Sequence, residues 1–384
     1  MTSLAVVAAE ASGDLLAASV LRGMKSIDPG LRAAGVGGPA MAEQGFEPWY
    51  SIDALSVRGY VEVLRAYPRL LAMRNAIRQR VLRWRPALFL GVDAPDFNLE
   101  LERRVRAAGI PAVHFIGPSI WAWRAKRIEK IRAAVDHVLL VFPFEEKIYR
   151  DAGIAATFVG HPLADLIAPG ADREAARRAL ALEARDATVA LLPGSRPAEV
   201  HYMGALFLEA AAWLQRERPG LQFVLPAASE ALYLRLRDLA ARTQPQLRLT
   251  VVQGRSHAAL AAADAGLVAS GTATLEAALF RRPMVIAYRM AALSYRIMRP
   301  KALLPWIGLP NILCGESLVP EFVQDQATPA ALGAAVLAQL DDDASRARIE
   351  QRFARLHDEL RRDCAARASE ALLRLIEARR GARG

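Results

Sequence analysis

The sequence predicts an α/β protein made of two doubly wound domains, each a parallel sheet with helices on both faces. The first observation is that short aliphatic or β-branched runs alternate with longer Ala-, Leu- and Arg-rich stretches of helical spacing. The second is that a polar stretch at 161–176, containing Pro and Gly, interrupts this alternation before it starts again. The third is the length, because 384 residues are enough for about two or three domains.

The apolar runs place the strands of each domain. In the first domain we expect strands at 4–9, 33–37, 87–92, 112–117, 137–142 and 156–159. After a junction near 165–185 we expect strands at 188–193, 222–226, 247–252, 266–269 and 283–288. The chain after Pro329 is rich in Ala, Arg and Leu, which predicts helices to its end. The expected divisions are 1–170, 171–345 and a helical segment, 346–384, that packs back on the first domain.

The composition excludes several classes of protein. Hydrophobic residues make up 53% of the chain and charged residues 23%, which is not the composition of a disordered protein. The two cysteines, Cys314 and Cys364, form no disulfide framework, so a reducing cytoplasm fits best. We expect no transmembrane helix, because charges interrupt every apolar stretch of about 18 residues. The chain opens as a strand rather than as a signal peptide.

The charge favours an anionic partner. There are 50 Lys and Arg against 40 Asp and Glu, a net charge of +10, which suits a nucleic acid, an acidic membrane or a phosphorylated ligand. Two spans, 63–92 and 277–315, contain no acidic residue and mix basic with large apolar side chains, a mixture that suits an anionic membrane surface. The alternative is that these Arg residues only solvate helix faces. The docking candidates are Val61, Leu64, Tyr67, Arg296, Arg299, Lys301, Leu303, Leu304 and Trp306.

Two loops of the second domain are suited to hold a phosphate. Residues 190–199 read ALLPGSRPAE, where a glycine lets the backbone approach a ligand and Arg196 offers a bidentate guanidinium to a diphosphate. Residues 269–276 read ASGTATLE and open a helix whose free N–H groups face an anion. Ordinary helix capping is the alternative for Thr272 and Thr274. Both loops follow strands of one sheet, where α/β proteins usually bind ligands. The resulting nucleotide-sugar candidates are Gly194, Ser195, Arg196, Ser270, Gly271, Thr272, Ala273, Thr274 and Glu276.

A carboxylate at the end of a first-domain strand is a candidate general base. Residues 90–98 read LGVDAPDFN, which puts Asp93 at the carboxyl end of an apolar strand, where a carboxylate is partly desolvated. The alternative is that Asp93 or Asp96 caps the next helix, a role that suits Asp96 better. The sequence leaves Asp96, Glu10 and Asp14 open as the base.

Two more loops of the first domain supply candidates for the acceptor side. EASGD at 10–14 follows the first strand, and PSIWAWR at 118–124 brings Trp, Pro and Arg together past another strand, which suggests the wall of a cleft. Core packing is the alternative for a single Trp. The acceptor-side candidates are Glu10, Ser12, Gly13, Asp14, Asp96, Ser119, Trp121, Trp123 and Arg124.

Several catalytic and metal-binding patterns are missing from the sequence. It contains no GxxxxGK[ST] loop, no HExxH and no GxSxG. His161 and His201 have no second ligand at a helical offset. We therefore expect chemistry that needs neither a metal nor a cofactor.

Taken together, these segments resemble the lipid-A-disaccharide synthase family, and the match runs from end to end. PSIWAWR and DAPDFN are the most specific motifs, whereas LPGSR and SGTATLE are closer to general nucleotide-sugar loops. The matching segments are EASGD at 10–14, GVGGPAM at 35–41, VEVL at 61–64, DAPDFN at 93–98, PSIWAWR at 118–124, FVGHPLAD at 158–165, LPGSR at 192–196, ASGTATLE at 269–276 and LPN at 309–311.

The resemblance implies a fold and a reaction. The fold is GT-B, two Rossmann-like domains facing each other across a cleft, with the last helix crossing back to the first domain. The reaction is an inverting transfer of 2,3-diacylglucosamine from UDP-2,3-diacylglucosamine to 2,3-diacylglucosamine 1-phosphate. Asp93 is the implied base, while Arg196 and the helix start at 271–274 take the place of a metal at the departing UDP. Glu276 and Asn311 join the donor site, with Glu276 at the ribose.

The resemblance also implies the partners and the location of the protein. Both substrates are anionic lipids, so we expect peripheral binding at the cytoplasmic face of the inner membrane and no binding to nucleic acid. A homodimer is compatible with the resemblance, and the sequence leaves the oligomeric state open. Two other hypotheses remain: a UDP-sugar 2-epimerase of the same architecture, and a basic nucleic-acid-binding protein, for which no RRM, zinc-finger or basic-zipper pattern is present.

Overall fold

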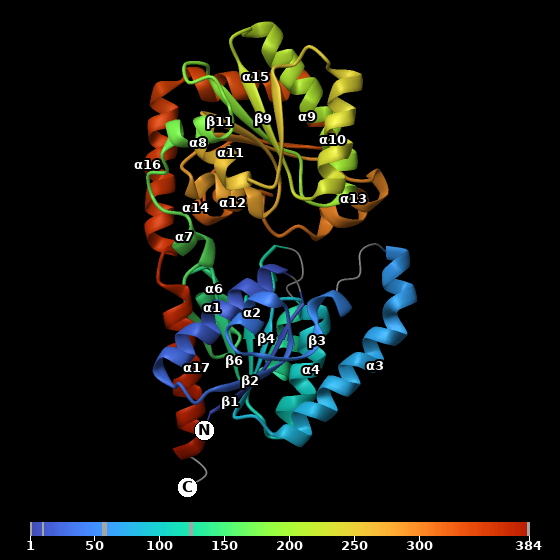
Figure 1. Ribbon diagram of the computed structural model, residues 1–384, viewed down its shortest axis with the longest axis vertical. Helices are drawn as coiled ribbons and strands as arrows, with labels where there is room; N and C mark the ends of the chain where they lie inside the picture. Colours follow the sequence, from blue (N-terminus) through green and yellow to red (C-terminus); the bar gives the residue numbers. More distant parts are fainter. Residues whose placement is uncertain (1, 10, 56–59, 123–125, 382–384) are drawn as a thin grey trace. The chain divides into compact units, whose positions relative to one another are not determined.

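A computed structural model describes the chain except for residues 1, 10, 56–59, 123–125 and 382–384. The chain folds as two compact units, Met1–Asp165 with Leu360–Gly384 and Leu166–Glu359. Each unit is a parallel sheet flanked by helices (Figure 1). In β1 (Ser3–Ala8) residues 4–8 are all buried, so helices cover both faces of the sheet and the strand needs a continuous apolar run.

The first unit has a seven-stranded sheet in the order β3-β2-β1-β4-β5-β6-β7. After β1 its strands are β2 (Arg32–Gly37), β3 (Glu47–Ser51), β4 (Leu88–Val92), β5 (Ala112–Phe115), β6 (His137–Leu140) and β7 (Ala156–Phe158). Its helices are α1 (Ala11–Ile27), α2 (Pro39–Glu43), the 3-10 turn η1 (Ile52–Ala54), α3 (Tyr60–Trp84), α4 (Pro95–Ala107), α5 (Arg127–Ala134), α6 (Glu145–Asp151), α7 (Pro162–Leu166) and α17 (Cys364–Gly381). Every strand pair is parallel, so all the carboxyl ends lie along one edge of the sheet.

The second unit has a six-stranded parallel sheet in the order β10-β9-β8-β11-β12-β13. Its strands are β8 (Thr188–Leu192), β9 (Gln222–Ala227), β10 (Leu249–Gln253), β11 (Ala265–Ala269), β12 (Met284–Tyr288) and β13 (Glu321–Val323). Its helices are α8 (Arg173–Ala179), α9 (Pro197–Glu217), α10 (Glu230–Thr243), α11 (Ser256–Ala262), α12 (Thr272–Leu279), α13 (Ala292–Met298), η2 (Arg299–Lys301), α14 (Leu309–Cys314), η3 (Gln324–Gln326), α15 (Pro329–Asp341) and α16 (Asp343–Leu360).

The expected strands are all present, and two strands that the sequence analysis missed lie at sheet edges. These are β3 and β13, the outer strands of the first and second sheets. No residue of either strand is fully buried, and β3 contains Glu47 and Pro48. An edge strand with one open side needs no continuous apolar run, so the signal that identified the central strands is missing.

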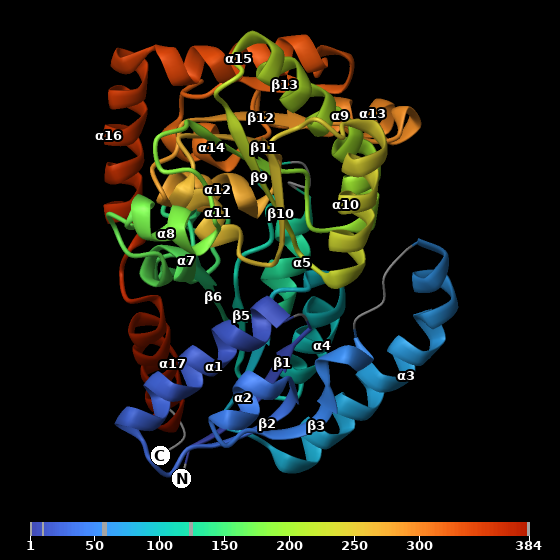
Figure 2. The ribbon, with the colours of Figure 1, turned by 45° about the horizontal axis from the view of Figure 1, so that its top comes forward.

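The chain returns to the first unit through α17, which packs along α1 (Figure 2). The carboxylate of Asp165 accepts hydrogen bonds from the backbone N–H groups of Asp363 (3.0 Å) and Cys364 (2.6 Å), at the start of α17. The two helices can approach closely because Gly23 has no side chain: a Cβ at this position would lie 2.5 Å from Ser369 Oγ. The unit limits at 165 and 360 differ from the expected 170 and 345, since α16 pairs with the second unit through Arg348 and Arg352 to Glu316.

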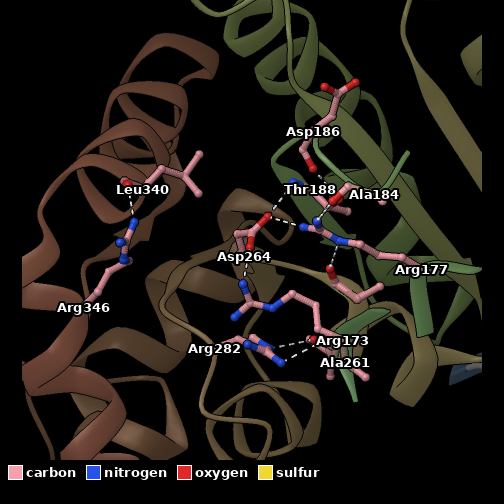
Figure 3. A network of polar contacts seen from close by, with 12 residues as sticks. Arg173, Arg177, Ala184, Asp186, Thr188, Ala261, Asp264, Arg282, Leu340 and Arg346 are labelled. Atoms are coloured by element: carbon pink, nitrogen blue, oxygen red, sulfur yellow. Dashed lines mark hydrogen bonds and ion pairs between the residues drawn. The ribbon is translucent and has the colours of Figure 1, made fainter. Parts of the chain in front are cut away.

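A network of arginines fixes the amino ends of strands in the second unit (Figure 3). Buried Arg177 donates to the carbonyl oxygens of Ala184 (2.7 Å) and Ala262 (3.0 Å) and pairs with Asp264 at 2.6 Å. Asp264 also pairs with Arg173 at 2.8 Å. Arg173, Arg177 and Asp264 line a cavity of about 320 Å³, and Arg173 also lines one of about 250 Å³. The partners of Arg173 and Arg177 are protein groups, so we interpret the network as structural.

Candidate active site

The loops chosen from the sequence lie at the point in each sheet where the strand order reverses direction. In the first sheet β1 is next to β4, so the loops that begin at 9 and 93 start side by side. In the second sheet β8 is next to β11, so the loops that begin at 193 and 270 also start side by side. Parallel α/β sheets bind ligands at this point, beyond the carboxyl ends of the strands. Each unit therefore has one candidate binding edge.

The loop after β8 presents Arg196 to solvent. Gly194 has φ 114°, and a Cβ there would lie 2.5 Å from Glu199 Cβ, so the turn requires glycine. Glu199 Oε2 accepts hydrogen bonds from the backbone N–H groups of Ser195 (3.0 Å) and Arg196 (3.2 Å). Glu199 Oε1 lies 3.2 Å from Arg196 Nη1, and the Arg196 side chain is 75% exposed. A tight turn thus holds a cationic side chain at the edge of the sheet.

The loop after β11 opens α12 with exposed backbone. No side chain caps the helix at Gly271, and Gly271 and Thr272 are exposed, while Ala273 is half-buried. Thr274 is buried and its hydroxyl donates to the carbonyl oxygen of Gly271 at 2.8 Å, so this threonine stabilises the first turn instead of facing a ligand. The Ser270 hydroxyl donates to the carbonyl oxygen of Ile307 at 2.7 Å. The free backbone N–H groups at the start of α12 can therefore bind an anion.

Glu276 lies one turn further along α12 and has a partner that the sequence analysis missed. Burial raises the pKa of the Glu276 carboxyl, and His257 on α11 opposes this rise. His257 Nε2 lies 3.6 Å from Glu276 Oε2. The sequence gives no sign of this pair, because the two residues come from different helices.

Asn311, which the resemblance places in the donor site, is held by protein groups. Its side chain is fully buried, and Nδ2 donates to the Val319 carbonyl and to Glu321 Oε1, both at 2.8 Å. Oδ1 accepts from the backbone N–H groups of Leu318 (2.9 Å) and Val319 (3.0 Å). Glu321 also accepts from the N–H of Gly308 at 3.0 Å. The amide is thus used by protein groups and orders the segment around α14, and its place in the donor site stays a prediction.

Asp93 occupies a strained turn at the end of β4. Asp93 and Ala94 have φ angles of 52° and 43°, a left-handed conformation that costs about 1–3 kcal/mol per residue outside glycine. The turn is held by the backbone: Asp93 N–H donates to Phe115 O at 2.9 Å, and Asp93 O accepts from Asn98 Nδ2 at 2.8 Å. The Asp93 carboxylate is half-buried and has no hydrogen-bond partner among the described residues. Strain of this kind occurs where a side chain must point in a particular direction.

The other acidic candidates have structural partners. Buried Asp14 accepts hydrogen bonds from the backbone N–H groups of Gly38 (2.7 Å), Ala40 (3.0 Å) and Met41 (3.2 Å), so it caps the start of α2. Asp96 lies in the first turn of α4, is exposed and pairs with Arg127. Glu10, Trp123 and Arg124 lie outside the described residues. Ser12 is exposed and Gly13 is buried at the start of α1.

Trp121 is part of a buried cluster that contains an ionisable group the sequence analysis missed. Its indole N–H donates to Glu145 Oε1 at 2.9 Å, and its ring packs edge-on against Phe144 with centroids 5.2 Å apart. Burial raises the pKa of Glu145 to about 8, and the hydrogen bonds from Trp121 and the backbone of Phe142 oppose this rise. Ser119 is exposed beside this cluster. Glu145 begins α6, just after the carboxyl end of β6. Its place after a strand of the parallel sheet was the signal that could have identified it.

The docking candidates lie on α13 and the segment after it. No residue of α13 is buried, and Arg296, Arg299, Lys301 and Leu303 are exposed, while Leu304 and Trp306 are partly buried. The side chains of Val61, Leu64 and Tyr67, at the start of α3, lie outside the described residues.

Two wider searches of the described residues give negative results. Among the helices that are described, none is both long and apolar enough to cross a membrane. No group of three or more His, Cys, Asp or Glu side chains in the described part of the chain is placed to hold a metal ion.

Two doubly wound units, each with candidate ligand loops at the switch point of its sheet, are the architecture of the GT-B fold. Solved structures agree on the fold. A glycosyltransferase of kitacinnamycin superposes with a TM-score of 0.61 at 17% identity over 97% of this chain and 98% of that one. A Glycyrrhiza uralensis protein complexed with glycyrrhetinic acid 3-O-monoglucuronide gives 0.66 at 11% identity over 100% and 97%.

Sequence comparison identifies the family. The family model described as lipid-A-disaccharide synthetase matches residues 4–376. The lipid-A-disaccharide synthase of Thiobacillus denitrificans is 55% identical over 98% of this chain and 100% of its own length. That of Albidiferax ferrireducens is 50% identical over 97% of each. The chain belongs to the lipid-A-disaccharide synthase family and is a glycosyltransferase, as the resemblance predicted. A Listeria monocytogenes protein described as a candidate UDP-N-acetylglucosamine 2-epimerase, 12% identical at a TM-score of 0.64, shows a likeness of fold alone. The epimerase hypothesis is not favoured, because the family model and the relatives of 50–55% identity are lipid-A-disaccharide synthases.

Proposed function

We propose that the chain transfers 2,3-diacylglucosamine from UDP-2,3-diacylglucosamine to 2,3-diacylglucosamine 1-phosphate, with Asp93 as general base and Arg196 at the departing UDP. The reaction follows from the family. The assignment of residues is supported above all by one observation: Asp93 and the Arg196 loop each lie at the switch point of their own sheet.

The first unit supplies the base. The primary hydroxyl of the acceptor attacks the anomeric carbon of the donor, its proton passes to the Asp93 carboxylate, and the bond from that carbon to the diphosphate oxygen breaks. One displacement inverts the anomeric carbon and gives a β-1′,6-linked disaccharide 1-phosphate and UDP. Asp93 suits this role because it is half-buried and its carboxylate is not used by neighbouring described groups.

The second unit supplies the donor site. As the bond breaks, negative charge grows on the diphosphate, and the exposed Arg196 guanidinium together with the open start of α12 stabilises it. Glu276, about one turn along α12 from that start, is suited to accept from the ribose hydroxyls. The Glu199 contacts to the backbone N–H groups of Ser195 and Arg196 hold this loop in place.

We further propose that α13 and the segment after it dock the enzyme on the cytoplasmic face of an anionic membrane. Five of the ten large apolar side chains that are exposed among the described residues lie between 293 and 307: Leu293, Ile297, Met298, Leu303 and Ile307. Arg296, Arg299 and Lys301 lie between them, and no acidic residue occurs from 277 to 315. An apolar surface with a cationic border is typical of proteins that bind lipid headgroups. The homodimer stays a prediction.

The test of the reaction is direct. The protein is incubated with both diacylated substrates in detergent micelles, and disaccharide 1-phosphate and UDP are measured. UDP must appear only when the acceptor lipid is present, and in equal amount to the disaccharide. Release of UDP without the acceptor would contradict the proposed transfer.

A further inference from the structure

The loop after β5, residues 116–122, begins at the Asp93 turn and has no part in the transfer as described so far. The Asp93 N–H donates to the carbonyl oxygen of Phe115, the last residue of β5, at 2.9 Å. Further along the loop, Ser119 is exposed and Trp121 is half-buried. The loop therefore starts at the candidate base and keeps part of its surface open to a ligand.

The backbone at the start of this loop is strained and is held from two sides. Ile116 has φ 73°, in the left-handed region that β-branched residues rarely adopt. Its N–H donates to the carbonyl oxygen of Leu139 on β6 at 3.0 Å. Gly117 follows, and a Cβ there would lie 2.8 Å from the hydroxyl oxygen of Tyr149 on α6. The neighbouring strand and α6 thus fix the direction in which the loop leaves the sheet.

Helix α6 also holds the middle of the loop. Ile120 is buried and packs in one apolar cluster with Tyr149. The indole N–H of Trp121 donates to Glu145 Oε1 at 2.9 Å. The other carboxyl oxygen, Oε2, accepts from the backbone N–H of Phe142 at 3.3 Å. Glu145 therefore ties the tryptophan to the backbone at the end of β6.

The hydrogen bond to Glu145 sets the orientation of the Trp121 ring. Burying a carboxyl group costs more than burying an apolar side chain, so packing alone would be served better by an apolar residue at 145. A hydrogen bond is directional, however, and holds the indole where packing alone would let it turn. The rings of Phe142 and Phe144 complete the support, at 82° and 81° to the indole with centroids 6.2 and 5.2 Å away.

We propose that Glu145 is a positioning residue for the acceptor: it holds the Trp121 indole as a wall against which the C–H face of the acceptor glucosamine ring packs. This inference rests on the proposed transfer, in which the first unit takes the proton from the acceptor. Aromatic side chains suit such a wall because they bury a large area and have few rotatable bonds to order.

Kinetics with Glu145 variants test the proposal. Glu145→Leu removes the acceptor of the indole N–H, so the KM for 2,3-diacylglucosamine 1-phosphate should rise about tenfold, while the KM for the UDP-linked donor stays at the parent value. Glu145→Gln keeps an oxygen for the indole and should restore the acceptor KM. Glu146→Gln, at the exposed neighbour, is the control and should behave like the parent. A fall in kcat with both KM values kept, or no rescue by Gln, overturns the proposal.

A double-mutant cycle tests whether Glu145 acts through Trp121. Trp121→Phe keeps an aromatic ring but has no N–H group. Adding Glu145→Leu to this variant should raise the acceptor KM no further, because the hydrogen bond is already absent. Additive effects of the two changes would show that Glu145 acts in another way.

A third measurement does not depend on turnover. The chain has six tryptophans, and the indole signal of Trp121 in ¹⁵N-labelled protein is identified by its loss in Trp121→Phe. Detergent micelles that contain 2,3-diacylglucosamine 1-phosphate should shift this signal, and empty micelles should not. An unchanged signal overturns the proposal even if Glu145→Leu fails to fold. If the signal shifts but no disaccharide forms, the proposed transfer is wrong while the acceptor contact stands, so the two failures are distinguishable.

Discussion

The carboxylate of Glu199 holds Arg196 twice, by accepting a hydrogen bond from its backbone N–H at 3.2 Å and by pairing with its guanidinium at the same distance. Both contacts are local, three residues apart on the turn that leads into α9. The guanidinium is therefore pre-oriented while most of its surface stays open to a ligand.

We expect Arg196→Ala to weaken UDP binding and to slow transfer together, because the guanidinium contacts the diphosphate in the bound donor and also as charge develops on it. Glu199→Gln should give a smaller loss of the same kind, since it keeps a backbone contact but releases the side chain. UDP affinity by calorimetry and turnover are the measurements. Glu209→Gln, an exposed carboxylate on the same helix, is the control. Unchanged UDP affinity in Arg196→Ala would remove Arg196 from the donor site.

Asp93→Asn preserves the size of the side chain but cannot accept a proton, so turnover should fall by roughly 10² or more while UDP affinity stays near the parent value. Asp96→Asn is the informative comparison, because Asp96 is exposed and paired with Arg127 and should tolerate the change. If the two variants show the reverse pattern, Asp96 is the base and Asp93 serves the turn.

Membrane docking separates into an electrostatic and an apolar contribution. Arg296→Gln, Arg299→Gln and Lys301→Gln together should weaken binding to anionic vesicles mainly at low salt, because exposed charges are screened over about 10 Å at 0.1 M salt. Leu293→Ser, Ile297→Ser and Leu303→Ser together should weaken it at all salt concentrations. Co-sedimentation with vesicles is the measurement.

The control for docking is a surface of similar composition elsewhere. On α10, Leu234, Arg235 and Arg237 are also exposed, but Glu230 and Asp238 lie among them. Replacing these three with Ser, Gln and Gln should leave vesicle binding unchanged. Equal binding by all the variants would mean that α13 does not dock.

Glu145 should make the stability of the protein fall as the pH rises. Its pKa in the folded chain is about 8, above the ordinary 4.5, so between these values the folded chain holds a proton that the unfolded chain has released. Buried His161, with a pKa lowered to about 4, stays neutral when folded, so from its ordinary 6.5 downward it makes stability rise with pH, and the effect of Glu145 is clearest toward pH 8.

We expect Glu145→Gln to flatten the decline in melting temperature from pH 6.5 to 8, since the amide is neutral throughout. Glu146→Gln, the exposed neighbour on α6, should keep the decline of the parent. Thermal unfolding at several pH values is the measurement. A slope in Glu145→Gln equal to that of the parent would show that the buried carboxyl does not titrate in this range.

The sequence by itself determined the two parallel sheets, their central strands and the loops that end them. Central strands buried on both faces, such as residues 4–8, must be continuously apolar, and a glycine such as Gly194 marks a turn that no other residue can form. Both signals are local in the chain, so they can be read without knowing what packs against them.

Only the tertiary structure decided which polar side chains are free to meet a ligand. Asp14 and Asp93 look alike in the sequence, yet Asp14 is saturated by N–H groups of α2, more than twenty residues away, and Asp93 is not. The Asn311 amide is likewise occupied by Val319 and Glu321, while Glu102 contacts His114 only because α4 packs against β5. The availability of a hydrogen-bonding group depends on its partners, and partners that are distant in the chain are set by packing.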